Sequence, residues 1–509
     1  MVKSALKLAV SRYLRPAQAF RTGGAGLRYL WLLCCIMALA GNGEAQSPPT
    51  GQGTYAITHV TVIDGTGAPP LEDATVVISA GRITTMGKAP GVRVPGDAVI
   101  VDGRGKYLIP GLWDMHVHTS TRNLASASMP RDRDQNSRFL LPGFVVHGIT
   151  GVRDMSGDLP RLQSWRQRIA QGELIGPRMV ITGYKFGSER AVLEGAPFPL
   201  RTPADVRTAV QQLKRAGGDF VKSGGELAPG LLDVLANEAH RQGLMMVGHV
   251  PDSITADHFA LVGGRSIEHL SGIVTGCDPL PIPSIWTRVV AIFRPGGDAG
   301  QLRDHCSPAG MARMARVLVE KKVYQVPTLI QLQAMARIQG PDSDHEERRA
   351  FMPPALRQPA PPPPPADRLE LLVQQFDRAK RLVGELHRLG VPMMAGTDLP
   401  GTERLPGFSL VDELALFVES GLTPSEALLT ATRNPAMFLG TIDSLGTVAR
   451  GKVADLVLLD ANPLDNIRNV SRVNLVMLAG KPYTAVDLEQ QRTGIIAELE
   501  RMSGSRAGN

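Results

Sequence analysis

The chain has 509 residues, 43% hydrophobic and 20% charged, so it can bury a large core and is not a disordered or fibrous protein. Its only long apolar stretch lies near the N-terminus, which excludes a membrane protein with many spans. The net charge of +7 is local, because removing the six cations and one anion of residues 1–45 leaves +2. A chain this close to neutral gives no electrostatic reason to predict nucleic-acid binding.

The N-terminus has the pattern of an export signal. A cationic segment precedes the 12 apolar residues Tyr29–Ala40, fewer than the roughly 20 that a membrane-spanning helix needs. Small-residue cleavage sites end at Ala40 and Ala45. We therefore expect residues 1–45 to be a signal peptide of a periplasmic or secreted protein, which would have no stable membrane span after cleavage. A retained anchor and a true start downstream of Met1 stay open.

Cleavage would leave Cys277 and Cys306 as the remaining cysteines. An exported protein can form a disulfide from such residues, but two cysteines do not define a disulfide scaffold. The sequence leaves their pairing open.

Both ends of the remaining chain have the composition of β-structure. Residues 54–108 contain short β-branched runs separated by Gly or Asp-Gly turns, and residues 445–485 repeat this pattern. We therefore predict a small β-sandwich built from both chain ends, followed by a C-terminal helix and tail over 486–509.

The middle of the chain, residues 109–444, alternates short apolar runs with amphipathic helical stretches such as 204–216 and 231–242. Eight strand–helix repeats predict an α/β fold, a (β/α)8 TIM barrel with parallel strands. The predicted strands are 110–116, 149–153, 179–183, 219–222, 245–249, 265–269, 323–328 and 392–397.

Two histidines close the first predicted barrel strand. His116 and His118 are two residues apart, so their side chains lie on the same side of that strand. Neutral imidazoles bind zinc and similar cations, and the carboxyl ends of barrel strands are where catalytic groups gather. Alone, this pair is a weak signal, because two ordinary histidines account for it more simply.

Four further polar residues each end a predicted strand: Lys222, His249, His269 and Asp398. Singly, each has a structural interpretation, as a solvated lysine, a histidine satisfied in the core or a helix cap. Together with the histidine pair they place imidazole, amine and carboxylate groups on five strands of one barrel, which indicates a metal site.

These motifs resemble those of the amidohydrolase superfamily, in the branch of imidazolonepropionases and Xaa-Pro dipeptidases. The resemblance covers residues 54–485. It is carried by Lys222 and by the segments Pro110–His118, His249–Asp252, Ser266–His269, Ala395–Asp398, Gly421–Leu428, Ala431–Pro435, Gly446–Val448 and Gly451–Val457.

The resemblance implies two divalent metal ions, with zinc the first choice because histidines dominate the ligands. His116, His118 and Asp398 would bind one ion, and His249 and His269 the other. Lys222, N-carboxylated, would bridge them, because an unmodified lysine stays cationic whereas a carbamate is anionic. Manganese, cobalt or iron would suit the same ligands.

The mechanism that follows from the resemblance is hydrolysis by a metal-activated hydroxide. Asp398 would be the catalytic residue that takes the proton from water and gives it to the leaving nitrogen. The expected substrates are dipeptides, N-acyl amino acids or cyclic amides. A lactonase or phosphoesterase on the same site and a catalytically silent binding protein remain alternatives, and a homo-oligomer is left open.

Other polar residues of the barrel have open or structural interpretations. Tyr184, after the third strand, is a candidate substrate contact, with a structural role equally open. Arg153 is interpreted as part of a structural ion pair, and His147 as a structural residue at the opposite barrel end. The chain departs from many relatives at the Ser-Gly-Gly that follows Lys222 and at Val411, which makes a relative's substrate unsafe to transfer.

Overall fold

The computed structural model describes residues 51, 53–120, 134–187, 199–252, 254–277, 306–339, 346–353, 357, 364–401 and 403–504. The predicted signal peptide lies outside these residues. Among the helices described, none is long and apolar enough to cross a membrane.

One mixed sheet of eight strands combines a segment from each half of the described chain, residues 54–110 and 456–483. Its two halves meet where β5 and β14 pair antiparallel, with Leu108 opposite Leu458. The sequence predicted two facing layers, but the structure assigns the strands to a single sheet, so the sandwich stays a prediction. The strands are β1 (Thr54–Val62), β2 (Leu71–Ser79), β3 (Arg82–Lys88), β4 (Val99–Asp102), β5 (Tyr107–Pro110), β14 (Leu456–Leu459), β15 (Val473–Leu478) and β16 (Lys481–Tyr483).

Side chains from strands far apart in this sheet share one apolar core. Ile57 and Ile83 from the first half pack in the same cluster as Leu456 and Met477 from the second. β-branched and aliphatic residues suit such a half-buried pleated surface. Burial of this shared core is what brings the two chain ends together.

The middle of the chain forms parallel strands that alternate with helices, a TIM-barrel-like α/β arrangement. Each of the first seven predicted strands has a counterpart, and β9 is an additional short strand. The strands form one sheet of β6 (Leu112–Val117), β7 (Ile149–Asp154) and β8 (Arg178–Ile181), and a second of β9 (Lys185–Phe186), β10 (Phe220–Ser223), β11 (Met245–Gly248), β12 (Gly264–Glu268) and β13 (Tyr324–Val326).

The eighth predicted strand, 392–397, is not a strand in the structure. It forms isolated parallel bridges, Met393 with Gln325 and Leu399 with Val117, between β13 and β6. Asp398 has a φ of 54°, outside the extended region, so regular strand geometry is lost where the chain carries this residue. The two parallel sheets are also joined between β8 and β10. There Asp219 donates its backbone N–H to the carbonyl of Ile181 (2.9 Å).

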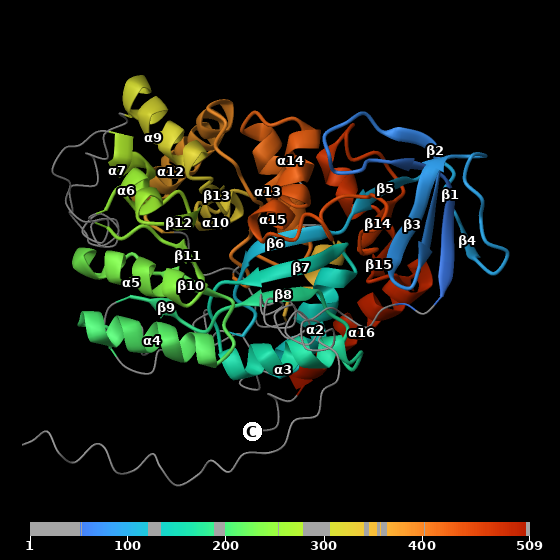
Figure 1. Ribbon diagram of the computed structural model, residues 1–509, viewed down its shortest axis with the longest axis horizontal. Coiled ribbons are helices and arrows are strands. Elements are labelled where there is room, and N and C mark those ends of the chain that lie inside the picture. The colour runs from blue at the N-terminus through green and yellow to red at the C-terminus, as the bar shows by residue number, and fades with distance from the viewer. Residues whose placement is uncertain are drawn as a thin grey trace, which may run out of the picture. The chain divides into compact units, whose positions relative to one another are not determined.

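Helices pack outside the parallel strands, and Figure 1 shows α4 and α5 lying side by side next to β9 and β10. In α4, Thr202 and Asp205 form a capping box and Pro203 follows the cap, so the sequence fixes where this helix begins. The helices are α2 (Gln135–Val145), α3 (Leu159–Ala170), α4 (Pro203–Arg215), α5 (Pro229–Arg241), α6 (Ala256–Leu261), α7 (Ile273–Cys277), α9 (Pro308–Glu320), α10 (Leu329–Met335), α11 (Glu346–Ala350), α12 (Ala366–Arg388), α13 (Phe408–Glu419), α14 (Pro424–Thr430), α15 (Arg433–Phe438), the 3-10 helix η4 (Ile467–Ser471) and α16 (Ala485–Gly504).

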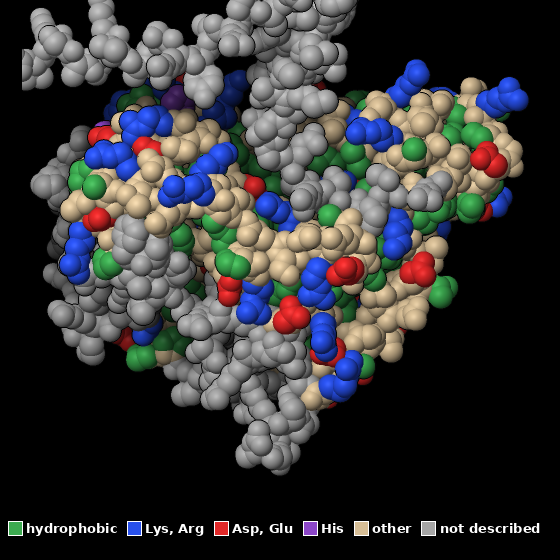
Figure 2. Space-filling model, turned by 60° about the horizontal axis from the view of Figure 1, so that its bottom comes forward, with side chains coloured by type: hydrophobic (Ala, Val, Ile, Leu, Met, Phe, Trp, Pro, Cys, Tyr) green, Lys and Arg blue, Asp and Glu red, His purple; other side chains and the backbone are tan. Residues whose placement is uncertain are grey.

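The pairing of the two remaining cysteines, which the sequence left open, has an answer in the structure. Cys277, at the end of α7, and Cys306, just before α9, form a disulfide with their Cα atoms 5.0 Å apart. The face displayed in Figure 2 carries lysine and arginine side chains among aspartate and glutamate side chains, in keeping with the small net charge of residues 46–509.

A buried ion pair joins the parallel strands to the eight-stranded sheet. The Arg178 Nε in β8 lies 2.5 Å from the Asp455 Oδ2, which precedes β14, and both side chains are buried. The Asp455 Oδ1 also accepts from the backbone N–H of Ala479 (2.6 Å). Each charge is therefore compensated inside the protein. Removing one of the two would leave the other buried without an opposite charge, which is strongly destabilising.

We predict that Arg178→Met lowers the free energy of unfolding by about 3–5 kcal/mol, because it leaves the Asp455 carboxylate buried without its partner. Adding Asp455→Asn should recover part of this loss, since the amide oxygen still accepts from Ala479 and carries no charge. Urea unfolding of the single and double variants measures both effects. A double variant less stable than Arg178→Met would contradict this account.

His147 lies between α2 and β7, buried against the rings of Phe351 and Phe408. Its Nδ1 donates to the carbonyl of Gly143 (2.7 Å). Burial lowers the pKa of this imidazole to about 4, so it is neutral in the folded protein. These contacts agree with the structural interpretation of His147.

Because the pKa of His147 is lower in the folded than in the unfolded chain, its contribution to stability is complete above about pH 6.5 and is lost as the pH falls toward 4. We predict that a shift from pH 7.5 to pH 5 lowers the free energy of unfolding of the wild type by about 2 kcal/mol more than that of His147→Gln. Urea unfolding at the two pH values gives this difference. Equal losses in both proteins would show that His147 does not titrate in this way.

Candidate metal centre

The structure brings all six predicted metal-site residues together at the carboxyl ends of the parallel strands. His116 and Lys222 lie within β6 and β10, and His249 and His269 directly follow β11 and β12. His118 follows β6 by one residue, and Asp398 lies on the bridging segment between β13 and β6. Strand ends from distant parts of the sequence thus build one cluster.

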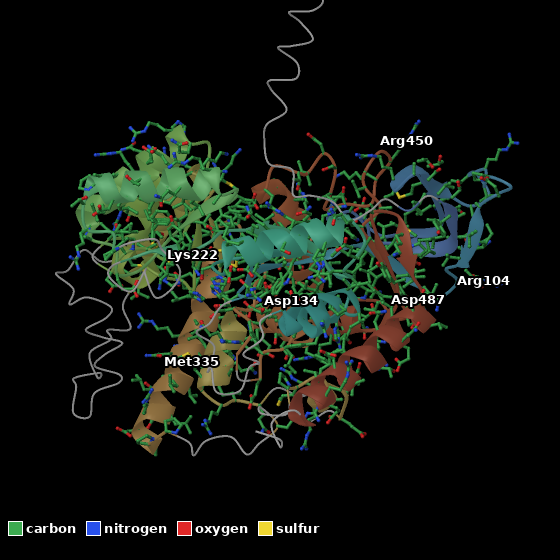
Figure 3. All side chains as sticks on the ribbon, turned by 90° about the horizontal axis from the view of Figure 1, so that it is seen from below. Arg104, Asp134, Lys222, Met335, Arg450 and Asp487 are labelled. Atoms are coloured by element: carbon green, nitrogen blue, oxygen red, sulfur yellow. A yellow bond between two sulfur atoms is a disulfide. The ribbon has the colours of Figure 1, made fainter. Side chains whose placement is uncertain are left out.

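Asp398 is at the middle of this cluster. Its Oδ1 lies 3.4 Å from the His116 Nε2 and 3.2 Å from the His118 Nε2. The Lys222 Nζ, on a side chain that Figure 3 labels in the interior, lies 3.4 Å from the same His118 nitrogen. The rings of His269 and His249 complete the cluster, with centroid distances of 4.7 Å from His116 to His269 and 5.1 Å from His269 to His249.

Outer partners fix the orientation of three of these imidazoles. The His116 Nδ1 contacts the Glu268 Oε2 (2.8 Å), and the His118 Nδ1 contacts the carbonyl of Ser156 (3.1 Å). The His269 Nδ1 lies 2.6 Å from the Thr328 hydroxyl, whose own proton goes to the carbonyl of Pro327. Each acceptor takes a proton on Nδ1, which leaves the lone pair of Nε2 directed into the cluster, the arrangement seen in metal-ligating histidines.

A buried ion pair supports the first of these contacts. Arg153 in β7 donates to both carboxylate oxygens of Glu268 (2.9 and 3.1 Å), and further to Ser266 and to the carbonyl of Met115. The interpretation of Arg153 as part of a structural ion pair agrees with these contacts. Through Glu268, the same pair orients His116.

Burial sets the protonation of the cluster. It lowers the pKa of His116 and His249 well below the usual value, and that of His269 to about 4. Burial alone would raise the pKa of Asp398, but its contacts with His118 and the other nearby imidazoles outweigh burial and hold that pKa well below its usual value. Neutral imidazoles and an ionised carboxylate are the forms that bind cations.

These residues fit a metal ion. His116, His269 and Asp398 each offer one ligand atom, and these atoms lie within 4.8 Å of one another. The His249 Nε2 is buried and has no hydrogen-bond partner among the described residues, so a ligand inside the cluster would satisfy it. Imidazole nitrogens with a carboxylate oxygen suit zinc and related transition metals.

The contacts of Tyr184 do not support the prediction that this side chain touches the substrate. Its side chain is buried in the main hydrophobic core, and its hydroxyl donates to the carbonyl of Ala209 in α4 (2.8 Å). Burial also raises the pKa of this phenol. The hydroxyl is therefore directed to a helix backbone and already has its partner.

The structure adds three residues to the surroundings of the cluster that the sequence did not single out. Thr328 holds His269, Gln331 donates its amide N–H to the Asp398 Oδ2, and the Arg404 Nη1 lies 3.9 Å from the same oxygen. Thr328 and Gln331 follow the seventh strand and Arg404 follows the eighth segment. Their position after a predicted strand end was the one sequence signal that could have identified these residues. This signal is weak, because polar residues are common in such loops.

The departure after Lys222 also has a structural consequence. This departure begins at Ser223, whose hydroxyl donates to the carbonyl of His249 (2.7 Å). The second departure, Val411, is buried in the main hydrophobic core. The first therefore acts on a candidate ligand, and the second on packing.

Comparison with known proteins decides the family. A family model described as "Amidohydrolase family" matches residues 107–483, most of the chain. The chain belongs to the amidohydrolase family. This confirms the resemblance drawn from the strand-end motifs.

The curated relatives are imidazolonepropionases, and a solved structure shares the fold. An imidazolonepropionase of Shouchella clausii is 36% identical over 96 residues, which are 18% of this chain and 21% of that protein. An imidazolonepropionase of Pseudomonas putida is 29% identical over 426 residues, 78% of this chain and 90% of that one. The first three curated relatives are matched over only 20–26% of their own length. A crystal structure of a Xaa-Pro dipeptidase with methionine in its active site is similar with a TM-score of 0.63 at 20% identity, over 85% of this chain and 100% of that one.

Helix α10, which carries Gln331, is held at its N-terminus by a residue from another helix. Thr328 precedes α10 with a φ of 51° and makes no side-chain cap. Instead Glu413 of α13, fully buried, accepts from the backbone N–H groups of Leu329 (3.0 Å) and Ile330 (2.8 Å). Glu413 thus supplies the missing cap and fixes α10 beside the cluster.

We predict that Glu413→Ala lowers the free energy of unfolding by about 2–4 kcal/mol, because two buried N–H groups lose their acceptor and a cavity forms. Glu419→Ala, at the exposed end of the same helix, is the matched control and should change stability by less than about 1 kcal/mol. Urea unfolding compares them. Equal effects would remove the capping role of Glu413.

Proposed function

We propose that this protein is a metal-dependent hydrolase that cleaves the C–N bond of an amide or peptide. The observation that carries the proposal is one cluster of four imidazoles and the Asp398 carboxylate, in which His116 and His118 lie within 3.4 Å of the Oδ1. Three of these imidazoles are oriented through Nδ1 by outer partners. Membership of the amidohydrolase family supports the same chemistry. The names of the relatives favour a small amide substrate, and we propose a dipeptide, an N-acyl amino acid or a cyclic amide.

The proposed ligand set is His116, His118 and Asp398 for one divalent ion and His249 and His269 for a second, with Lys222 as an N-carboxylated bridge. Zinc is the first choice for a site dominated by imidazoles. When bound, such ions act as Lewis acids toward the substrate carbonyl and make water acidic enough to supply hydroxide near neutral pH.

Asp398 is the residue that we propose to move the proton. The carboxylate is ionised in the folded protein, which is the form that can accept a proton from the attacking water. Gln331 donates to the Oδ2, and His116 and His118 lie beside the Oδ1, so the carboxylate is held in one orientation. The same carboxyl group then returns the proton to the leaving nitrogen as the C–N bond breaks.

We also propose a closed barrel for the middle of the chain and a sandwich for its two ends. Bridges at 393 and 399 and the hydrogen bond from Asp219 to Ile181 support a (β/α)8 barrel over residues 109–444 that is closed by the eighth segment. The shared core of the eight-stranded sheet supports a small β-sandwich made of residues 54–108 and 445–485.

We also propose that the protein is exported. The cationic and apolar composition of residues 1–45 supports a signal peptide. The Cys277–Cys306 disulfide supports an oxidising compartment, because such bonds are rare in the cytosol.

Metal content and amide hydrolysis test the proposal together. Protein prepared with bicarbonate should contain about two divalent ions per chain and hydrolyse members of a panel of dipeptides and N-acyl amino acids. Lys222→Met should lose bound metal and lower kcat/KM by about 100-fold or more. Lys106→Met, which removes a lysine that precedes β5 and pairs with Asp460, is the matched control and should change neither.

Other outcomes would overturn parts of the proposal. Metal content unchanged in Lys222→Met would remove the bridging role of that lysine. Hydrolysis of lactones or phosphoesters without amide hydrolysis would reassign the reaction. A protein that binds no metal and hydrolyses none of these substrates would be a silent binding protein.

A further inference from the structure

Arg404 is a buried cation beside the metal centre that the proposed mechanism does not use. It lies six residues after Asp398, in a turn where its backbone N–H donates to the carbonyl of Gly401 (3.1 Å). Its side chain is 11% exposed. The turn therefore keeps the guanidinium close to Asp398 instead of in solvent.

Among the described residues, the guanidinium of Arg404 makes no hydrogen bond. Its Nε is buried with no partner among the described residues, and its one described ion-pair contact, Nη1 to the Asp398 Oδ2 at 3.9 Å, is longer than a hydrogen bond. Arg153, the other buried arginine near the cluster, donates to Met115, Ser266 and Glu268. The fold therefore uses the donors of Arg153 and leaves those of Arg404 available.

Asp398 is a poor partner for this charge. Its Oδ1 faces His116 and His118, and its Oδ2 accepts from Gln331. A buried guanidinium without an acceptor costs several kcal/mol, a cost that evolution tolerates where a ligand supplies the acceptor. Planar guanidinium groups match carboxylates through paired hydrogen bonds.

The loop that carries Arg404 is anchored. Arg348 donates to the carbonyl of Glu403 (2.9 Å) and pairs with Asp412 of α13 (2.6 Å), which is also paired with Arg468 (2.9 Å). The residue before Arg404 is thus tied to a buried helix. A fixed guanidinium loses little conformational entropy when an anion binds.

We propose that Arg404 is a specificity-determining residue that binds a carboxylate on the leaving-amine side of the substrate. The inference rests on the proposed amide hydrolysis. Because Asp398 returns its proton to the leaving nitrogen, the group attached to that nitrogen lies on the side of Asp398, where Arg404 is. The substrate class is therefore a dipeptide or N-acyl amino acid with a free α-carboxylate, in preference to an uncharged amide or cyclic amide.

The test compares each substrate with its uncharged analogue. Wild type, Arg404→Met and Arg404→Lys are assayed with a panel of N-acyl amino acids and with the same compounds as C-terminal amides. Arg404→Met should lower kcat/KM for the acids by about 100-fold, mainly through KM, and leave the amides within about threefold. Arg404→Lys should recover part of the loss, since it restores the charge without the paired geometry.

Controls separate recognition from folding and metal binding. Arg104→Met removes an exposed arginine from the edge of the eight-stranded sheet, far from Lys222 in Figure 3, and should match the wild type. Metal content and thermal midpoint of Arg404→Met should also match the wild type. Calorimetry should detect binding of the product amino acid to the wild type and a loss of about 100-fold in Arg404→Met.

Two results would overturn the inference while leaving the proposed function intact: equal activity of the wild type on acids and amides, or an equal loss on both in Arg404→Met. A fall in metal content in that variant would show a structural role instead. If the wild type hydrolyses no amide, the proposed function fails, and the calorimetric comparison alone decides whether Arg404 binds a carboxylate.

Discussion

The metal centre depends on the contacts that the buried carboxylate of Glu268 makes with Arg153 and His116. It accepts from Arg153 on one side and orients His116 on the other, so a charged group of the barrel core and a candidate ligand share one acceptor. Without Arg153 the carboxylate would be an uncompensated buried charge, and without the carboxylate the His116 ring would have no fixed tautomer. The stability of the strand ends and the geometry of the site are therefore not separable at this position.

Much of the site was predictable because the barrel topology does the work of assembly. Parallel strands bring their carboxyl ends to one face, so His249, His269 and Lys222 needed only to be placed at strand ends to be placed near His116. The eighth segment was misjudged because residues 392–397 have the apolar composition of a strand, whereas the structure gives this part of the chain only isolated bridges. Its bridge partners lie in β13 and β6, which local sequence does not contain.

The residues around the ligands were not predictable for the same reason. Tyr184 has the polarity and the position of a substrate contact, but α4 packs close enough to take its hydroxyl. Glu413 lies 84 residues from its partner Leu329, and its role exists only once α13 and α10 have packed together. The cysteine pair was open for a related reason, because spacing along the chain does not determine distance in space.

The two arginines beside the metal centre, Arg153 and Arg404, have different partners. Arg153 reaches four acceptors supplied by strands β6 and β12, so its charge is fully used inside the barrel. Arg404 sits on a loop tied down by Arg348, with a guanidinium that the described residues leave without an acceptor. If Arg404 served only to balance the charge of Asp398, a direct hydrogen bond between them would stabilise the pair more than the 3.9 Å separation of the Arg404 Nη1 and the Asp398 Oδ2. The position of Arg404 is better explained by a third partner, and a carboxylate that arrives with the substrate has the charge and the shape to be that partner.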